Sequence, residues 1–276
     1  MPAVTTNGVT LHYTREGAGE QVLLVHGYLF GARWWRPQID WLAGHFEVTA
    51  VDLRGHMDSE TPDDDAGYDL WNQAEDLHGL IGALRLRPVH YVGLSMGGMI
   101  GMRLALSHPE DIRSLVLLDT SADPEDPEKA ERYAAMRQVV ASGELAAVTP
   151  ALPPIFFVDD FITEHADIVD DWLARLVASN HMGVVRSGQA IDGRDDISGR
   201  LGEIGVPTLV IHGSEDVAIP VDRAERIAHG IPGARLEVIH AGHQSNVDRP
   251  EETSRLIRDF LVALSTGPTT PAAAAS

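Results

Sequence analysis

The sequence contains no cysteine among its 276 residues. This excludes disulfides, cysteine-ligated zinc and thiol chemistry, and it suits a reducing compartment. No window approaches the roughly 18 unbroken apolar residues of a membrane span. The first residues, MPAVTTNGVT, lack the basic segment and the apolar run of a signal peptide. Together these absences predict a cytoplasmic protein that does not enter the membrane.

Basic residues are also scarce. The chain has 21 Lys and Arg against 41 Asp and Glu, so its formal net charge is −20. Such a surface repels nucleic acids and anionic membranes, which leaves a small molecule as the expected partner. The length fits one large domain, or one domain carrying an insertion. We expect a monomer or a homodimer.

Short apolar runs recur along the chain, each of strand length and rich in Val, Leu or Ile. Their unbroken apolar character indicates strands that are buried on both faces, as in a parallel sheet. Ahead of them, AVTT, the turn pair Asn7-Gly8 and VTLHYTREG predict a β-hairpin at one edge of the sheet. The runs are QVLLVHG, FEVTAVD, VHYVGLS, SLVLLDT, PTLVIHG and ARLEVIHA.

Helical patterns separate these runs, for example in YDLWNQAEDLHGLIGALRL and PEETSRLIRDFLVAL. Strands that alternate with helices predict an α/β fold with a mostly parallel, doubly wound sheet. The alternation stops between about Ser121 and Gly205, where helical patterns follow one another. We therefore expect a core of residues 1–120 and 206–265, a helical cap inserted over the sheet at 121–205, and a disordered tail at 266–276.

A serine between glycines lies in YVGLSMGGM, directly after one apolar run and before a helical pattern. A strand, Gly93-x-Ser95-x-Gly97 and a helix describe a turn sharp enough to lift the hydroxyl off the sheet edge. The alternative interpretation is a Gly-rich turn whose serine caps the helix. In the functional interpretation Ser95 is a nucleophile, which needs a base and a group that orients the base.

Partners for this serine are expected in loops past the carboxyl ends of the strands. His243 lies in such a loop, whereas His240 ends the strand pattern itself. The H-x-x-H spacing of this pair has no acidic third ligand, so we expect no metal and no cofactor. Asp216, in the segment SED, is favoured as the acid over Asp119, which ends another strand. Either carboxylate could accept the Nδ1 hydrogen of the histidine.

An oxyanion at the serine would need two amide donors. We expect them to be the backbone amides of Met96, next to the serine, and Tyr28, in a loop held by His26. Large apolar side chains are expected to line the substrate pocket between cap and sheet, although each aromatic ring could equally pack in the core. These residues are Phe30, Trp34, Phe156, Phe157, Phe161, Trp172 and Met182.

Several segments together resemble the α/β-hydrolase fold: LLVHGYLFGARWW, VDLRGHMDSETP, VGLSMGGMIGMRLALSHPEDIRSLVLLDT, LVIHGSEDVAIP and AGHQSNVDRPEE. The resemblance runs from about Asn7 to Leu264 and covers the cap only loosely. GLSMGGMIG and HQSNVDRPEE are similar to 3-oxoadipate enol-lactonases and related lactonases and esterases. The resemblance implies ester hydrolysis through an acyl-enzyme on Ser95, with the same triad and the same oxyanion donors.

One position departs from the family pattern. Met57, in GHMDS, stands where the family usually carries a glycine. The loop must therefore take another conformation or tolerate strain there.

Three functions fit these observations. The first is a serine hydrolase that cleaves a small carboxylic ester or lactone, and the ordered triad candidates favour it. The second is a hydrolase of C–C bonds in ring-cleavage products, because the same triad can serve that chemistry. The third is a non-catalytic small-molecule receptor built on the fold. The apolar pocket residues favour a neutral lactone or aryl ester over a small dicarboxylate.

Overall fold

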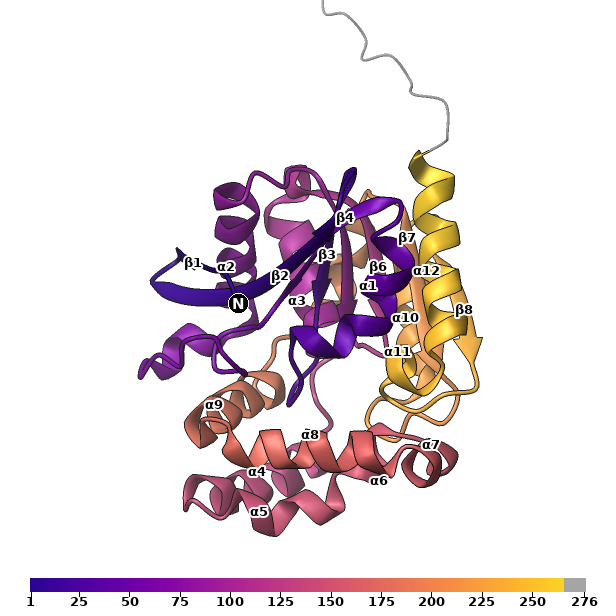
Figure 1. Cartoon of the computed structure of the whole chain (residues 1–276). Helices are drawn as coiled ribbons and strands as arrows, with labels where there is room; N and C mark the ends of the chain where they lie inside the picture. The colour runs from indigo at the N-terminus through magenta and orange to yellow at the C-terminus, as the bar shows by residue number, and fades with distance from the viewer. Residues whose placement is uncertain (266–276) are drawn as a thin grey trace, which may run out of the picture.

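The computed structural model describes residues 1–265, with an eight-stranded sheet at the centre (Figure 1). The strand order is β1-β2-β4-β3-β5-β6-β7-β8. The β1–β2 and β2–β4 pairs are antiparallel, and every later pair in that order is parallel. The mostly parallel sheet with a hairpin at one edge is therefore confirmed. The strands are β1 (Ala3–Thr6), β2 (Val9–Gly17), β3 (Glu20–Val25), β4 (Phe46–Val51), β5 (Val89–Leu94), β6 (Ile112–Leu118), β7 (Thr208–Gly213) and β8 (Arg235–Ile239).

The inner strands are buried on both faces, as their unbroken apolar runs predict. Every residue of β5 is buried, and Val92 pairs in register with Leu24 of β3 and Val116 of β6. The last strand, β8, is less buried than expected, and Val238 is 49% exposed. The reason is its position: an edge strand has a neighbouring strand on one side only.

Helices cover both faces of the sheet (Figure 1). Apolar side chains of α2, α3 and α10 join one buried cluster, and those of α1 and α12 join a second cluster on the other face. Helix α2 begins after Asp69, whose carboxylate accepts the backbone amides of Trp71 and Asn72. These helices are α1 (Arg36–Leu42), α2 (Leu70–Ala83), α3 (Met96–Ser107), α10 (Val221–Gly230), α11 (Ser245–Asp248) and α12 (Pro250–Ser265).

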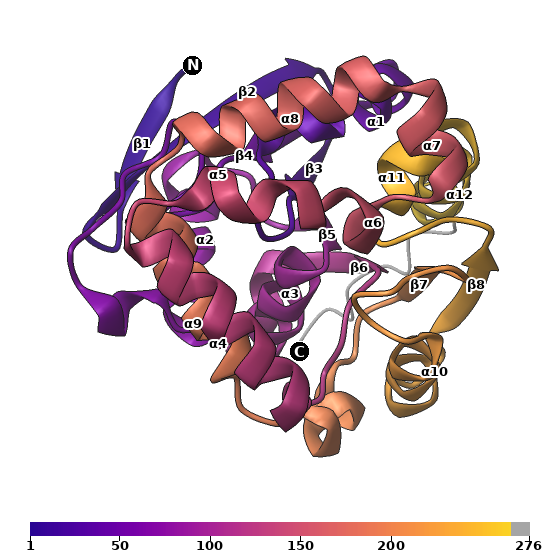
Figure 2. The ribbon, with the colours of Figure 1, turned by 90° about the horizontal axis from the view of Figure 1, so that it is seen from below.

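Helices α4 to α9 form a layer across the carboxyl ends of the strands, which we call the cap layer (Figure 2). They follow β6 and precede β7 in the chain. The division into core, cap and tail stays a prediction, and the tail lies outside the described residues. The helices of this layer are α4 (Pro127–Ala141), α5 (Leu145–Val148), α6 (Pro153–Phe156), α7 (Asp159–Glu164), α8 (Ala166–Ala178) and α9 (His181–Asp192). Short 3-10 turns span Ala32–Trp35, Asp65–Tyr68, Pro109–Asp111, Thr149–Ala151 and Ser198–Glu203.

An aromatic cluster joins the cap layer to the loop that follows β3. The ring of Phe30 stacks on Trp172 of α8, with centroids 4.9 Å apart. The indole N–H of Trp172 donates to the carbonyl oxygen of Leu29 at 3.1 Å. The cluster therefore fixes α8 against the segment next to Tyr28. Its aromatic members are Phe30, Trp34, Phe156, Phe157, Phe161 and Trp172.

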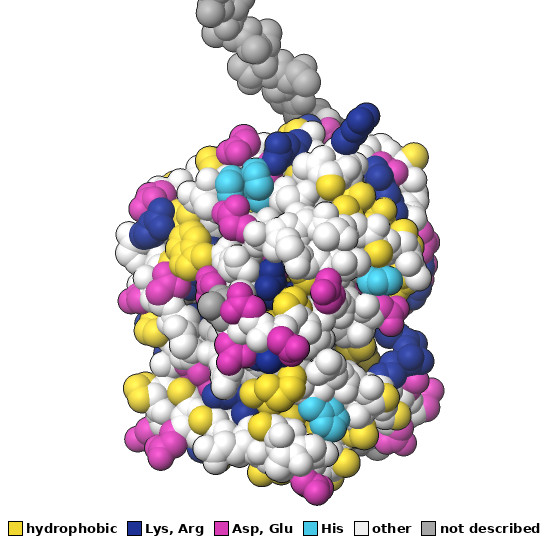
Figure 3. Space-filling model, turned by 90° about the vertical axis from the view of Figure 1, so that its left-hand side faces the viewer, with side chains coloured by type: hydrophobic (Ala, Val, Ile, Leu, Met, Phe, Trp, Pro, Cys, Tyr) yellow, Lys and Arg dark blue, Asp and Glu magenta, His cyan; other side chains and the backbone are white. Residues whose placement is uncertain are grey.

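Charged side chains are spread over the surface. On the face drawn in Figure 3, acidic side chains lie among basic ones rather than in a single patch. Such an arrangement provides no extended basic surface there for a polyanion. Within residues 1–265, no helix combines the length and the apolar character needed to cross a membrane.

Substitution of Trp172 tests the aromatic cluster. Trp172→Ala should lower the free energy of unfolding by about 3–5 kcal/mol, because it empties a buried site and removes the donor to Leu29. Urea unfolding followed by circular dichroism measures the change. Ile168→Ala is the control, because its side chain lies on the same helix and is 38% exposed. Equal losses in the two variants would contradict the packing.

Candidate active site

Ser95 lies on the turn between β5 and α3. Its backbone has φ 52° and ψ −114°, a left-handed conformation that is rare for a residue with a side chain. Its N–H donates to the carbonyl oxygen of Leu118 at 2.8 Å, and its own carbonyl accepts the Thr120 hydroxyl at 2.7 Å. The serine side chain makes no capping hydrogen bond to α3, which disagrees with the interpretation of Ser95 as a simple helix cap.

A close backbone approach explains the glycine two residues after the serine. A Cβ on Gly97 would lie 2.3 Å from the carbonyl oxygen of Val25 in β3. Any side chain would therefore push α3 away from the sheet. Glycine at this position therefore allows α3 to begin directly at the carboxyl ends of the strands, where the Ser95 side chain faces the loops.

His243 and Asp216 reach Ser95 from the loops after β8 and β7. The Ser95 hydroxyl donates to Nε2 of His243 at 2.8 Å, and Nδ1–H of His243 donates to Oδ2 of Asp216 at 2.8 Å. The other carboxylate oxygen of Asp216 accepts the backbone amides of Ala218 and Ile219 at 2.8 and 2.9 Å. The structure thus brings together the three side chains that the sequence nominates, and all three are buried.

The environment of His243 favours its protonated form. Burial alone would lower the pKa of the imidazole, but the charge and hydrogen bond of Asp216, with the charge of Asp119, raise the pKa above its ordinary value. A carboxylate in direct contact stabilises an imidazolium. The histidine is therefore arranged to take a proton from the serine and hold it.

Asp119 and His240, the alternative acid and base, make their contacts elsewhere. Oδ1 of Asp119 accepts the amide of Gly213 at 2.8 Å, and Oδ2 accepts the hydroxyl of Ser245 at 2.5 Å. The side chain of His240 is 71% exposed and lies 3.8 Å from Glu215. Asp119 instead joins the ends of β6 and β7 to the start of α11.

The loop after β3 approaches the serine from the other side. A Cβ on Gly27 would lie 3.1 Å from Cβ of Ser95. Nε2 of His26 accepts the amide of Leu53 at 2.9 Å, so Nδ1 carries the hydrogen and donates to the Gly27 carbonyl at 2.7 Å. Burial lowers the pKa of His26 well below its ordinary value, so the ring is neutral. His26 holds the loop, as expected.

The two expected oxyanion donors lie on these neighbouring segments. Met96 is the first residue of α3, where a backbone amide has no acceptor within its own helix. Tyr28 follows Gly27 on the loop that contacts Ser95. Their role as oxyanion donors stays a prediction.

Met57 adopts the left-handed backbone conformation that glycine takes most readily. Its φ is 46°. Its side chain lies against Gly31, where an added Cβ would be only 2.4 Å from Cγ of Met57. The loop therefore carries the backbone strain of a positive φ at a residue with a side chain.

Ser95 and His243 face a cavity of about 110 Å³ beneath the cap layer. Its wall is mainly aliphatic, and most of it belongs to α4, α5, α6 and α9 of the cap layer. Helix α9 closes one side with Val184, Gly188 and Ile191. The aliphatic lining includes Met99, Met136, Val140, Leu145, Leu152 and Ile155.

The expected aromatic lining needs correction. Among the described residues, only Phe156 of the seven nominated side chains lines this cavity. The other five aromatic side chains pack against one another in the aromatic cluster, and this packing buries them away from the cavity. Met182 is 39% exposed on the first turn of α9. The residues misplaced by the sequence analysis are Phe30, Trp34, Phe157, Phe161, Trp172 and Met182.

The cavity also has a charged side, which the sequence does not indicate. Glu125 and Lys129 lie 3.6 Å apart, and Arg137 is ion-paired with Asp192. All four side chains are at most 16% exposed. Within this described lining each charge has an opposite neighbour, so the cavity is close to neutral. Residues of this kind on amphipathic helices normally face solvent, so no sequence signal places them in the cavity.

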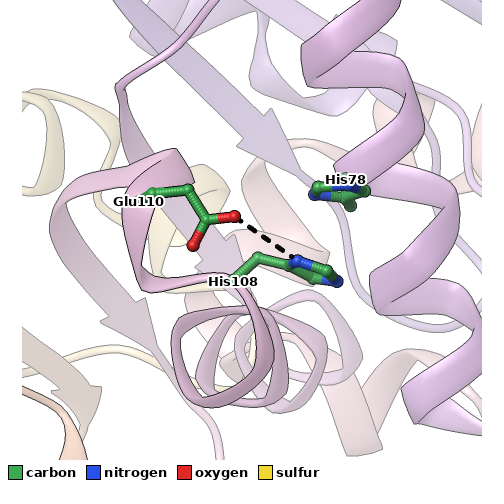
Figure 4. Close-up of side chains that lie close together, drawn as sticks. All are labelled: His78, His108 and Glu110. Carbon is green, nitrogen blue, oxygen red and sulfur yellow. Dashed lines mark ion pairs between the residues drawn. The ribbon is translucent and has the colours of Figure 1, made fainter.

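One cluster of metal-capable side chains, His78, His108 and Glu110, lies outside the cavity lining (Figure 4). The two imidazole rings stack with centroids 3.7 Å apart and planes at 21°. Nδ1 of His78 bonds Asp111 and Nε2 of His108 bonds Glu75, both at 2.8 Å. The in-plane lone pairs of stacked rings do not converge on one point. Ring stacking and ion pairs account for this cluster.

Comparisons with known proteins show the family of the chain. Residues 21–250 match the family model described as alpha/beta hydrolase fold. A putative carbamate hydrolase RutD of Variovorax paradoxus is 32% identical over 268 residues, which are 92% of this chain and 97% of the relative. The enol-lactonase of Burkholderia xenovorans LB400 superposes with a TM-score of 0.89 at 29% identity, covering 95% of this chain and all of that one. A thermophilic esterase of Thermogutta terrifontis gives a TM-score of 0.90 at 27% identity, covering 96% of this chain and all of that one.

The charge of Asp216 should control the titration of His243. Asp216→Asn removes the carboxylate that favours the imidazolium, so the pKa of His243 should fall. Titration of the His243 ring by NMR measures the shift. Asp119→Asn should lower the same pKa less, because that charge acts without a hydrogen bond to the ring. An unchanged pKa in Asp216→Asn would contradict this arrangement.

Proposed function

The chain belongs to the alpha/beta hydrolase fold family, and we propose that it is a serine hydrolase that cleaves a small carboxylic ester or lactone through an acyl-enzyme on Ser95. By its family and by the names of its relatives it is a hydrolase. The observation that carries the serine mechanism is the pair of 2.8 Å hydrogen bonds that joins Ser95 to His243 and His243 to Asp216.

The first half-reaction forms the acyl-enzyme. Oγ of Ser95 attacks the substrate carbonyl while Nε2 of His243 takes the hydroxyl proton. The negative charge moves to the carbonyl oxygen, where the amides of Tyr28 and Met96 stabilise it. As the C–O bond to the alcohol breaks, the imidazolium returns its proton to the leaving oxygen. In a lactone that alcohol stays attached to the acyl group.

The second half-reaction releases the acid. A water molecule takes the place of the leaving alcohol, and neutral His243 removes its proton as it attacks the acyl carbon. Collapse of the second tetrahedral intermediate breaks the bond to Oγ of Ser95, which regains the proton from the histidine. Asp216 keeps the same tautomer available in both halves because its carboxylate is fixed by two backbone amides.

The cavity suggests a neutral substrate with an apolar arm. Most of its wall is aliphatic, and its four charged side chains pair with one another. A substrate carboxylate would enter this space without a free cation, and burying an unpaired charge is costly. Lactones and esters without a charge fit this environment better than a small dicarboxylate.

A carbamate is a second candidate substrate. The relative from Variovorax paradoxus is named a putative carbamate hydrolase, and its match extends over nearly the whole of both chains. A carbamate carbonyl can be attacked by Ser95 in the same way, giving a carbamoyl-enzyme that water then hydrolyses. Carbamates and esters are both uncharged, so the near-neutral cavity does not distinguish them. Only measured rates of hydrolysis can rank the two substrates.

Removal of the Ser95 hydroxyl tests the mechanism. Ser95→Ala should lower kcat/KM for p-nitrophenyl esters by at least about 10³-fold, because the nucleophile is lost. A fluorophosphonate probe should label the wild-type protein at Ser95, as peptide mass spectrometry can establish, and should not label the variant. Ser142→Ala, at the end of α4, is the matched control. Ordinary turnover by Ser95→Ala would refute the acyl-enzyme.

A substrate panel tests the class of molecule. Neutral lactones and aryl esters should be hydrolysed with kcat/KM about tenfold or more above their carboxylate-bearing analogues, because the cavity offers no free cation. Carbamates of the same size and a vinylogous diketone complete the panel. A preference for the carboxylates would contradict the neutral class, and rapid cleavage of the diketone would favour C–C bond hydrolysis.

A further inference from the structure

The residues on both sides of His243 are hydrogen-bonded toward the cap layer. The amide of Gln244 donates to the carbonyl oxygen of Phe156 at 2.9 Å. The amide of Gly242 donates to Oδ2 of Asp248 at 2.7 Å, and the same oxygen accepts the amide of Val158 at 3.4 Å. Asp248 is therefore a bridge between the histidine loop and the segment that follows α6.

This bridge is buried and tightly packed. Asp248 is only 4% exposed, at the end of α11. A Cβ on Gly242 would lie 2.9 Å from Oδ2 of Asp248 and 3.2 Å from the carbonyl oxygen of Phe156. The loop and the cap segment thus meet without room for a side chain between them. A shift of the cap segment must be transmitted to the residue before His243.

The same cap segment also borders the cavity. The ring of Phe156 lines the cavity, and its centroid lies 5.7 Å from that of His243. A substrate that fills the cavity therefore presses on the element that supports the base. In the proposed mechanism this base must keep hydrogen-bond geometry with Ser95 and with Asp216 at once.

We propose that Asp248 is a positioning residue, whose carboxylate ties the His243 loop to the cap segment 156–158 and so aligns the imidazole with Ser95. The inference rests on the proposed serine hydrolase function. It assigns to Asp248 no contact with the substrate or with the reacting atoms. The base and the cavity wall are consequently linked through one buried side-chain acceptor, beside the backbone hydrogen bond of Gln244 to Phe156.

The chemistry of Asp248 indicates which property matters. Burial raises its pKa to about 7, against the opposing effect of the two backbone amides. Its Oδ1 is buried without a hydrogen-bond partner among the described residues. A neutral side chain of the same shape can therefore replace the carboxylate, provided that one oxygen still accepts hydrogen bonds from the amides of Gly242 and Val158. The bridge therefore requires a hydrogen-bond acceptor at position 248 and does not require a negative charge there.

The test compares two substitutions of nearly equal size. Asp248→Leu removes the acceptor and should lower kcat by about 10- to 100-fold with KM little changed, because small misplacements of a catalytic group have effects of this order. Asp248→Asn keeps an acceptor oxygen and should retain kcat within about threefold. Both are assayed with p-nitrophenyl esters, and active sites are counted by fluorophosphonate labelling. A folded Asp248→Leu with wild-type kcat would overturn the proposal.

Arg249 provides the matched control. Its guanidinium donates to Asp160 of α7 at 2.9 Å, so it joins the end of α11 to the cap layer nearer the surface. Exposed ion pairs contribute little, so Arg249→Ala should change kcat by less than about twofold. A loss as large as that of Asp248→Leu would mean that the surface ion pair matters as much as the buried contact, and would overturn the special role of the buried carboxylate.

A second variant tests the same bridge in case Asp248→Leu does not fold. Val158 has φ −73° and ψ 154°, which proline can adopt, so Val158→Pro removes the cap donor to the Asp248 carboxylate. It should lower kcat by about 3- to 10-fold. A folded Val158→Pro with wild-type kcat would overturn the proposal if Asp248→Leu cannot be prepared.

Hydrogen exchange separates this inference from the proposed function. In Asp248→Leu, peptides that contain residues 156–158 and 242–244 should exchange faster than in the wild type, whether or not the protein hydrolyses esters. A wild-type protein that neither reacts with the probe nor turns over esters would refute the hydrolase mechanism and the catalytic role of the bridge. An active wild type with an unimpaired Asp248→Leu would refute the bridge alone.

Discussion

The left-handed backbone of Ser95 is the constraint on which the rest of the site depends. It directs the side chain away from α3 and toward the loops at the carboxyl ends of the strands. Hydrogen bonds from both sides of the turn to the end of β6 hold this conformation. The close contact of Gly97 with β3 then fixes where α3 begins, and with it the first amides of the helix. Every other group of the site is placed relative to this turn.

Buried carboxylates organise the loops around that turn. Asp119 joins the ends of β6 and β7 to α11, Asp216 holds the histidine, and Asp248 joins the histidine loop to the cap segment. Each accepts at least one backbone amide, so loops that lack regular pairing still have their donors satisfied. The result is a polar network with little freedom between a parallel sheet and an aliphatic cavity. Such a network can hold an imidazole in one orientation through a reaction cycle.

The cap layer determines the character of the cavity. Its large aromatic side chains pack on the loop after β3, and smaller aliphatic side chains are left to face Ser95. Charged residues of α4, of α9 and of the segment before α4 enter the cavity wall in opposite-sign pairs, which leaves the space nearly neutral. Packing of the aromatic cluster and selection of the substrate are therefore linked, because one layer of helices does both.

Local patterns in the sequence were enough to predict the sheet, the helices between its strands and the candidate nucleophile, since burial on both faces and a Gly-x-Ser-x-Gly turn each involve neighbouring residues. The sequence also nominated Asp216 and His243, because parallel strands bring their carboxyl ends to one edge whatever the loops do. Only the tertiary structure decided between Asp216 and Asp119, since that choice depends on which carboxylate reaches Nδ1. It also decided that Phe156 alone among the nominated aromatic residues faces the cavity, and that Asp248 supports the histidine loop. These outcomes depend on how helices far apart in the chain rotate and pack against one another, and periodicity within one segment does not contain that information.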